Sequence, residues 1–76
     1  MKTVKIRLSS IEAVRNFVEI VRKFKGDIDL SSGRYIVDAK SIMGIFSLDL
    51  MNPITLTAHN DDCDKLIDSL KDYIVD

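Results

Sequence analysis

The chain has 76 residues, 46% of them hydrophobic and 30% charged, with a net charge of −1 and a sequence pI of about 5.7. Such a length predicts one small domain over residues 1–76, with little room for an enclosed active site beside the core. The balanced charge argues against a nucleic-acid-binding protein, although seven of the eleven basic residues lie in residues 1–25.

The first elements are predicted by alternation and then by helical spacing. Residues 3–8 alternate between apolar and polar side chains, as in a half-buried strand. Ser9 and Glu12 have the spacing of a capping box, which marks the start of a helix. We expect this helix to end near residue 25, before Gly26. Its apolar stripe comprises Val14, Phe17, Val18, Val21 and Phe24.

A hairpin should follow the first helix. Residues 27–31 and 35–39 form two alternating segments, and Gly33 between them supplies the positive φ that a two-residue turn requires. On the second strand we expect the core face to comprise Tyr35, Val37 and Ala39. That assignment leaves Ile36 on the outer face of the sheet.

The second half of the sequence predicts a short helix, a strand and a final helix. Ser41 is a favourable N-cap for a helix over residues 41–48, where Ile45 with Ile42 or Leu48 would enter the core and Met43 would stay exposed. Pro53 opens an alternating strand through residue 59, and Asn60 or Asp61 caps the last helix. The buried stripe expected for that helix comprises Cys63, Leu66, Ile67, Leu70, Tyr73 and Ile74.

The resulting order, β-α-β-β-α-β-α, defines the fold class. Every expected strand has one apolar face, and each long helix has one apolar stripe. The simplest packing is an α/β (α+β) open-faced sandwich, a four-stranded antiparallel sheet with three helices on one face.

Few residues suggest a metal or redox site. His59, the single histidine, should lie at the surface, and its acidic neighbours together with Cys63 make no recognisable metal motif. Cys63 is expected to act as a small apolar residue. We expect neither a cofactor nor a bound metal. No apolar run approaches a membrane span and the start is not that of a signal peptide, so we expect a cytoplasmic protein.

The segment KSIMGIFSL, residues 40–48, closely resembles the segment around the regulatory serine in HPr proteins of low-GC Gram-positive bacteria. HPr proteins are the small phosphocarriers of the bacterial sugar phosphotransferase system. The likeness extends back through residues 26–41 and, more loosely, across the whole chain. It implies the HPr-type open-faced sandwich, with sheet order 1-4-2-3.

The resemblance fails at the family's phosphohistidine. The family motif, Gly-[Leu/Ile]-His-x-Arg-Pro-Ala, lies where the loop after the first strand meets the first helix. Counted back without gaps from residues 23–28, its His, Arg and Pro positions fall at Ser10, Glu12 and Ala13. Serine cannot pass on a labile phosphoryl group as histidine does, and a carboxylate would repel phosphate. This departure argues against phosphate transfer, and we expect no catalytic residue and no enzyme activity.

The resemblance implies a role for Ser41 instead. In the family, the matching serine is the target of an HPr kinase/phosphorylase, and a transcriptional regulator recognises the phosphorylated form. A paralogue without the histidine, catabolite-repression HPr, acts only by that route. Phosphate on Ser41 would add charge at a helix N-terminus, where the helix dipole favours it. The partner-binding residues expected around it are Lys40, Ile42, Met43, Gly44 and Phe46.

Two alternatives remain open. The chain could be a phosphocarrier of the phosphotransferase system that uses a group we have not recognised. It could also be a scaffold that binds phosphotransferase-system proteins without chemistry, through Ser9, Ser10 and the basic first helix, which carries Arg15 and Arg22. Gly44 is costly within a helix and predicts a close backbone approach, either by the last helix or by a partner.

Overall fold

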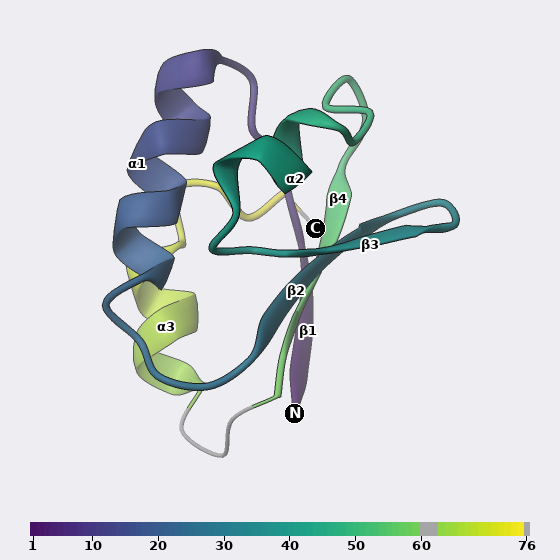
Figure 1. Cartoon of the computed structure of the whole chain (residues 1–76). Coiled ribbons are helices and arrows are strands. Elements are labelled where there is room, and N and C mark those ends of the chain that lie inside the picture. Colours follow the sequence, from purple (N-terminus) through teal and green to yellow (C-terminus); the bar gives the residue numbers. More distant parts are fainter. Residues whose placement is uncertain (60–62, 76) are drawn as a thin grey trace.

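The computed structural model describes residues 1–59 and 63–75. Within them the chain forms a four-stranded sheet and three helices, in the predicted order (Figure 1). The elements are β1 (Lys2–Ile6), α1 (Ile11–Val21), β2 (Ile28–Ser32), β3 (Tyr35–Asp38), α2 (Ile42–Phe46), β4 (Ile54–Ala58) and α3 (Asp64–Ser69).

The sheet has the order β1-β4-β2-β3, and each neighbouring pair is antiparallel. Alternation along the strands gives it two unlike faces. On β4, for example, Ile54, Leu56 and Ala58 are buried, whereas Thr55 and Thr57 are only half-buried. The helices cover the apolar face, so the predicted open-faced α/β sandwich is confirmed (Figure 1).

Helix α1 begins one residue later than the capping-box prediction and ends earlier. Its N-cap is Ser10, not Ser9, and the Ser10 hydroxyl oxygen accepts a hydrogen bond from the Ala13 N–H at 3.0 Å. The helix ends at Val21, well before Gly26, because the N–H groups of Lys23 and Phe24 bond three residues back instead of four. The predicted stripe is otherwise confirmed, with Phe24 half-buried beyond the helix end.

The hairpin between β2 and β3 turns at Gly33, whose φ is +59°. On strand β3, the prediction that Tyr35 lies on the core face is wrong. Ala39 is buried and Val37 half-buried, as expected for the core face, but the side chain of Tyr35 is 69% exposed. Tyr35 has the parity of Val37, yet it lies near the hairpin tip, beyond the residues that the helices cover (Figure 1). Ile36 is 71% exposed, on the outer face.

The last helix is shorter than its apolar spacing predicted. Helix α3 covers Asp64–Ser69, Cys63 occupies its N-cap position, and the predicted caps Asn60 and Asp61 lie outside the described residues. Of the predicted stripe, Cys63, Leu66 and Leu70 are buried, and the remaining members are half-buried against the core. None of the helices in the described ranges has the length and hydrophobicity of a membrane span.

Candidate functional site

Helix α2 has the N-cap predicted for it. The Ser41 hydroxyl oxygen accepts a hydrogen bond from the backbone N–H of Gly44 at 3.1 Å, and the Ser41 carbonyl accepts one from Ile45 N–H at 3.0 Å. Ser41 is half-buried, so its hydroxyl lies at the surface end of the helix and is not part of the core. The helix therefore presents a serine oxygen beside its first N–H groups.

The residue before this serine ties α2 to the end of α1. The Lys40 ammonium donates hydrogen bonds to the carbonyl oxygens of Phe24 at 2.8 Å and Gly26 at 3.1 Å. In return, the Arg22 guanidinium donates to the Lys40 carbonyl oxygen at 3.4 Å. The cation of Lys40 thus satisfies carbonyl groups beyond the helix end, and Arg22 brings a second positive charge close to Ser41.

The side chains of α2 divide into a buried and an exposed set. Ile45 and Leu48 are buried and Ile42 is half-buried, whereas Met43 is 81% exposed and Phe46 is 40% exposed. Of the two predicted core pairs, the structure favours Ile45 with Leu48 over Ile45 with Ile42, and Met43 is exposed as predicted. The helix therefore presents two large apolar side chains to solvent, Met43 near the Ser41 cap and Phe46 at its last position.

Gly44 lies at a tightly packed position within the chain. A Cβ atom at this position would lie 3.2 Å from the Ser41 hydroxyl oxygen and 3.2 Å from the Val37 Cβ atom. The close approach therefore comes from β3 and from the helix's own cap. The prediction that the last helix approaches Gly44 is wrong. A partner is not needed to explain the glycine either, because Val37 on β3 already lies close to it.

A groove of about 480 Å³ lies where the loop after β1 meets α1, the region of the family's phosphohistidine motif. The groove joins this loop to α2 and to the segment that follows α2. Its lining residues are Arg7, Leu8, Ser9, Ser10, Ile11, Phe46, Leu50 and Met51. The lining contains hydroxyl groups, one guanidinium and apolar side chains, but no imidazole, so it offers no histidine nucleophile.

Five lining residues were not among the predicted site residues: Arg7, Leu8, Ile11, Leu50 and Met51. Ile11 continues the helical spacing of Val14 and Val18, but spacing alone does not tell where the covering residues stop, and Ile11 is exposed. Met51 is exposed and Leu50 half-buried in the loop between α2 and β4, where no periodic pattern exists. Four exposed large apolar residues lie on α2 or along this groove, and we call them the apolar patch: Ile11, Met43, Phe46 and Met51.

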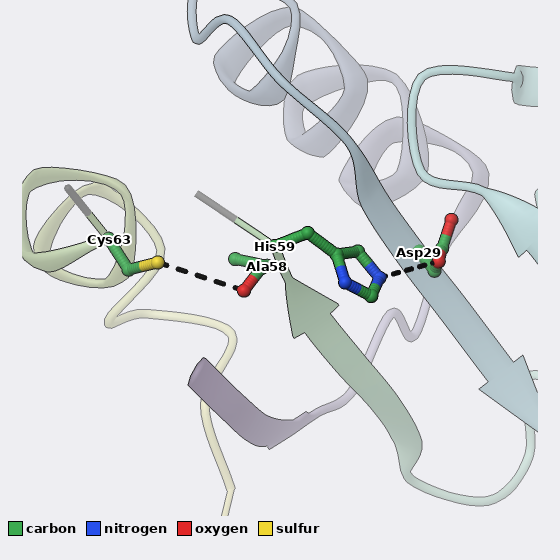
Figure 2. Close-up of polar contacts among 4 residues, drawn as sticks. All are labelled: Asp29, Ala58, His59 and Cys63. Atoms are coloured by element: carbon green, nitrogen blue, oxygen red, sulfur yellow. Dashed lines mark hydrogen bonds and ion pairs between the residues drawn. The ribbon is translucent and has the colours of Figure 1, made fainter. Parts of the chain in front are cut away.

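His59 lies at the other end of the sheet. It directly follows Ala58, which pairs with Lys2 at the start of β1, whereas Ser10 follows the end of β1. The five residues of β1 span four steps of the strand, which separate its two ends by about 13 Å. The His59 Nε2 atom lies 2.8 Å from an Asp29 carboxylate oxygen (Figure 2), and both side chains are partly exposed. His59 therefore cannot substitute for a histidine at the start of α1.

Cys63 is buried beside the same strand end, with its sulfur 3.7 Å from the Ala58 carbonyl oxygen (Figure 2). This environment fits the predicted role of a small apolar residue that packs α3 against β4. Within residues 1–59 and 63–75, no three His, Cys, Asp or Glu side chains are arranged to hold a metal ion.

Comparison with known proteins places the chain among phosphotransferase-system proteins. The family model described as "PTS HPr component phosphorylation site" matches residues 10–76. A solved structure of HPr-C-His from Thermoanaerobacter tengcongensis is 34% identical, with a TM-score of 0.82, and the alignment covers 95% of this chain and 89% of that chain. Phosphocarrier protein HPr from Bacillus anthracis str. Ames is 30% identical, with a TM-score of 0.71 and coverage of 97% and 94%. No curated protein sequence matches significantly.

Proposed function

Because the chain belongs to the HPr family of the phosphotransferase system, we propose its function from the family features that it keeps and lacks. It acts as a regulatory binding protein that is switched by phosphorylation of Ser41, and it does not carry phosphate on histidine. The single observation that carries this proposal is the contrast between the two helix starts. Helix α2 keeps a capped serine beside an exposed apolar surface, whereas α1 starts at a serine cap without an imidazole.

The lost carrier function is supported by the chemistry at the start of α1. Glu12 adds a negative charge in the first turn of α1, beside Ser10. A phosphoryl group arriving there would meet a carboxylate at the family's arginine position. Phosphate on a serine is also a stable ester, so Ser10 could not pass it to a sugar permease as a phosphohistidine does.

Phosphorylation of Ser41 is supported by its geometry and charge environment. Phosphate would add about −1.5 to −2 charges at the N-terminus of α2, where the helix N–H groups stabilise negative charge. Arg22 already bonds to the adjacent Lys40 carbonyl, so a guanidinium lies close by. The modification would therefore change the surface potential while leaving the buried side of α2 in place.

The apolar patch gives a partner a surface to recognise together with the phosphate. Met43 supplies a flexible, polarisable side chain and Phe46 a large one, and both suit an adaptable contact. Ile42 and the backbone at Gly44 would border this contact, while Lys40 contributes by fixing the position of Ser41. The partners, by family, are an HPr kinase/phosphorylase and a transcriptional regulator or other phosphotransferase-system protein, which implies a cytoplasmic protein that is a substrate and a ligand, not an enzyme.

The test of the switch is phosphorylation with ATP and an HPr kinase/phosphorylase, followed by intact mass. We expect one added phosphate on the wild-type chain and none on Ser41→Ala. Ser47→Ala is the matched control, since Ser47 is an exposed serine at the other end of the same helix, and it should still gain one phosphate. A phosphate that persists in Ser41→Ala, or no phosphate when the kinase modifies an ordinary HPr, would contradict the proposal.

The partner surface needs a separate binding measurement. Phosphorylated wild-type chain should bind the regulator more tightly than the unmodified chain, and Met43→Glu should weaken that binding without changing the phosphorylated mass. Thr57→Glu, on the uncovered face of the sheet, is the matched charge control and should bind as wild type. Equal binding of the two phosphorylation states would show that Ser41 is not the switch.

A second candidate is supported by the family match itself. The matching model is described as a phosphorylation site and begins at residue 10, and the Bacillus anthracis protein is named a phosphocarrier. Transfer would then use a group other than an imidazole at the start of α1. An acid-labile adduct formed from phosphoenolpyruvate and the first enzyme of the system would support this candidate.

A further inference from the structure

The two edges of the sheet differ in how they are covered. At the β1 edge, residues near the C-terminus pair with the end of the strand. Ile6 forms a bridge with Ile74, and Val75 N–H donates to the Lys5 carbonyl oxygen at 3.0 Å. At the other edge, β3 has β2 as its single neighbour within the described part of the chain, so one side of its backbone is left without a strand.

The hairpin register shows which groups of β3 point to this edge. Ala39 N–H donates to the Ile28 carbonyl oxygen at 2.9 Å, so odd-numbered residues of β3 direct their backbone groups toward β2. Ile36 and Asp38 consequently direct theirs outward. Asp38 uses its carbonyl for the Ser41 N–H, at 3.0 Å, which leaves the Asp38 N–H and both groups of Ile36 facing the edge.

The side chains along this edge have a self-complementary order. Ile36 is a large apolar residue that is 71% exposed at the centre of the strand. Two positions before it is Arg34, in the hairpin turn, and two positions after it is Asp38, one of whose carboxylate oxygens accepts the Lys40 N–H at 2.8 Å; both residues are exposed. An identical segment laid antiparallel about Ile36 would therefore oppose each arginine to an aspartate.

We infer that β3 is an association site for a second copy of this chain, which adds its own β3 in antiparallel orientation. The two Ile36 residues then form a hydrogen-bonded pair, since each offers an outward N–H and C=O to the other. Arg34 of each copy lies opposite Asp38 of the other, on either side of the central isoleucine pair. The contact is isologous, so it closes at a dimer and extends the sheet across two chains.

The interface is short, and its affinity should be correspondingly weak. It pairs residues 35–37 of the two strands, with Asp38 facing Arg34 of the turn, well below the surface that a stable dimer buries, so we expect a dissociation constant between about 10 µM and 1 mM. Sedimentation velocity from micromolar to millimolar chain should show a monomer shifting to a dimer. A monomer across that range would overturn the inference.

Charge exchange tests the register. In a dimer of the Arg34→Asp variant, aspartates would face each other at positions 34 and 38. In a dimer of the Asp38→Arg variant, arginines would do so. Each variant alone should therefore dimerise about tenfold more weakly or worse. An equimolar mixture of the two variants restores both opposite-charge pairs and should form a heterodimer with wild-type affinity. Failure of the mixture to associate, with both variants folded by circular dichroism, would contradict the Arg34–Asp38 pairing.

A second pair of variants separates β3 from the apolar patch. Ile36→Lys should abolish the dimer, whereas Met43→Lys on α2 should leave it unchanged. Hydrogen exchange by NMR gives the matching readout in the wild-type chain, because the Ile36 amide should gain protection with concentration while the Val37 amide, already bonded to β2, should not. A dimer that survives Ile36→Lys or is lost in Met43→Lys would assign association to another surface.

Discussion

The Ser41 hydroxyl oxygen caps the backbone of Gly44 and leaves little space for a side chain there. The oxygen accepts the Gly44 N–H at 3.1 Å, and it would lie 3.2 Å from a Cβ atom added at Gly44. A side chain at Gly44 would therefore meet the Ser41 cap and the Val37 side chain, each at 3.2 Å.

Gly44→Ala should for this reason fail to stabilise the protein. Alanine gains about 1 kcal/mol of helix propensity over glycine, but the added methyl group must displace the cap or the stiff Val37 side chain. We expect the free energy of unfolding to stay equal or fall by about 1 kcal/mol. Urea unfolding measures it, with Asn16→Ala on the exposed face of α1 as a control that should gain about 0.5 kcal/mol. A stabilised Gly44→Ala would contradict this account, because it would show that Ser41 and Val37 leave room for a methyl group.

Lys40→Met should destabilise the link between α1 and α2. The ammonium group satisfies the carbonyl oxygens of Phe24 and Gly26, and methionine keeps the length of the side chain without donors. We expect a loss of about 1–2 kcal/mol in the free energy of unfolding. Lys23→Met, at an exposed lysine of the same turn region, should change it by less than about 0.5 kcal/mol. Equal effects of the two substitutions would show that the Lys40 bonds contribute nothing specific.

Ser10→Ala should lower stability and Ser9→Ala should not. The Ser10 hydroxyl accepts the Ala13 N–H, and its loss costs about 1 kcal/mol, or about 4–8 °C in Tm for a chain of this size. Thermal unfolding of the two variants side by side decides which serine caps α1. A larger loss of Tm in Ser9→Ala than in Ser10→Ala would contradict this result and support the predicted Ser9–Glu12 capping box.

His59→Gln should have almost no effect. The contact with Asp29 lies between partly exposed side chains at a strand end, so its removal should change the free energy of unfolding by about 0–1 kcal/mol. The variant should also gain phosphate on Ser41 as the wild-type chain does, because His59 lies at the opposite end of the sheet from Ser10. A His59→Gln chain that lost phosphate uptake from any donor would make this histidine functional after all.

The strands and their order followed from alternation and resemblance because half-buried strands leave a period of two in the sequence. The Ser41 cap was predictable for a similar reason, since a serine before an apolar one-turn segment has a local physical role. Burial at the ends of elements was not predictable. Tyr35 has the correct parity for the core but extends past the covering helices, and Ile11 has the correct spacing but sits at the open end of α1.

Helix ends and close approaches also depended on tertiary structure. Helix α1 stops at Val21 although apolar spacing continues to Phe24, and the carbonyl groups beyond it are satisfied by Lys40, which is distant in sequence. The residue that restricts Gly44 is Val37 on β3. Contacts between elements of this kind leave no periodic signal in a single sequence.

The most direct test of the proposed function is intact mass after phosphorylation from the two donors in parallel. One sample receives phosphoenolpyruvate and the first enzyme of the phosphotransferase system, and the other receives ATP and an HPr kinase/phosphorylase. An ordinary HPr serves as the positive control for both. We predict no added mass from phosphoenolpyruvate and one acid-stable phosphate from ATP. An acid-labile phosphate from phosphoenolpyruvate, with none from ATP, would contradict the account and make the chain a phosphocarrier.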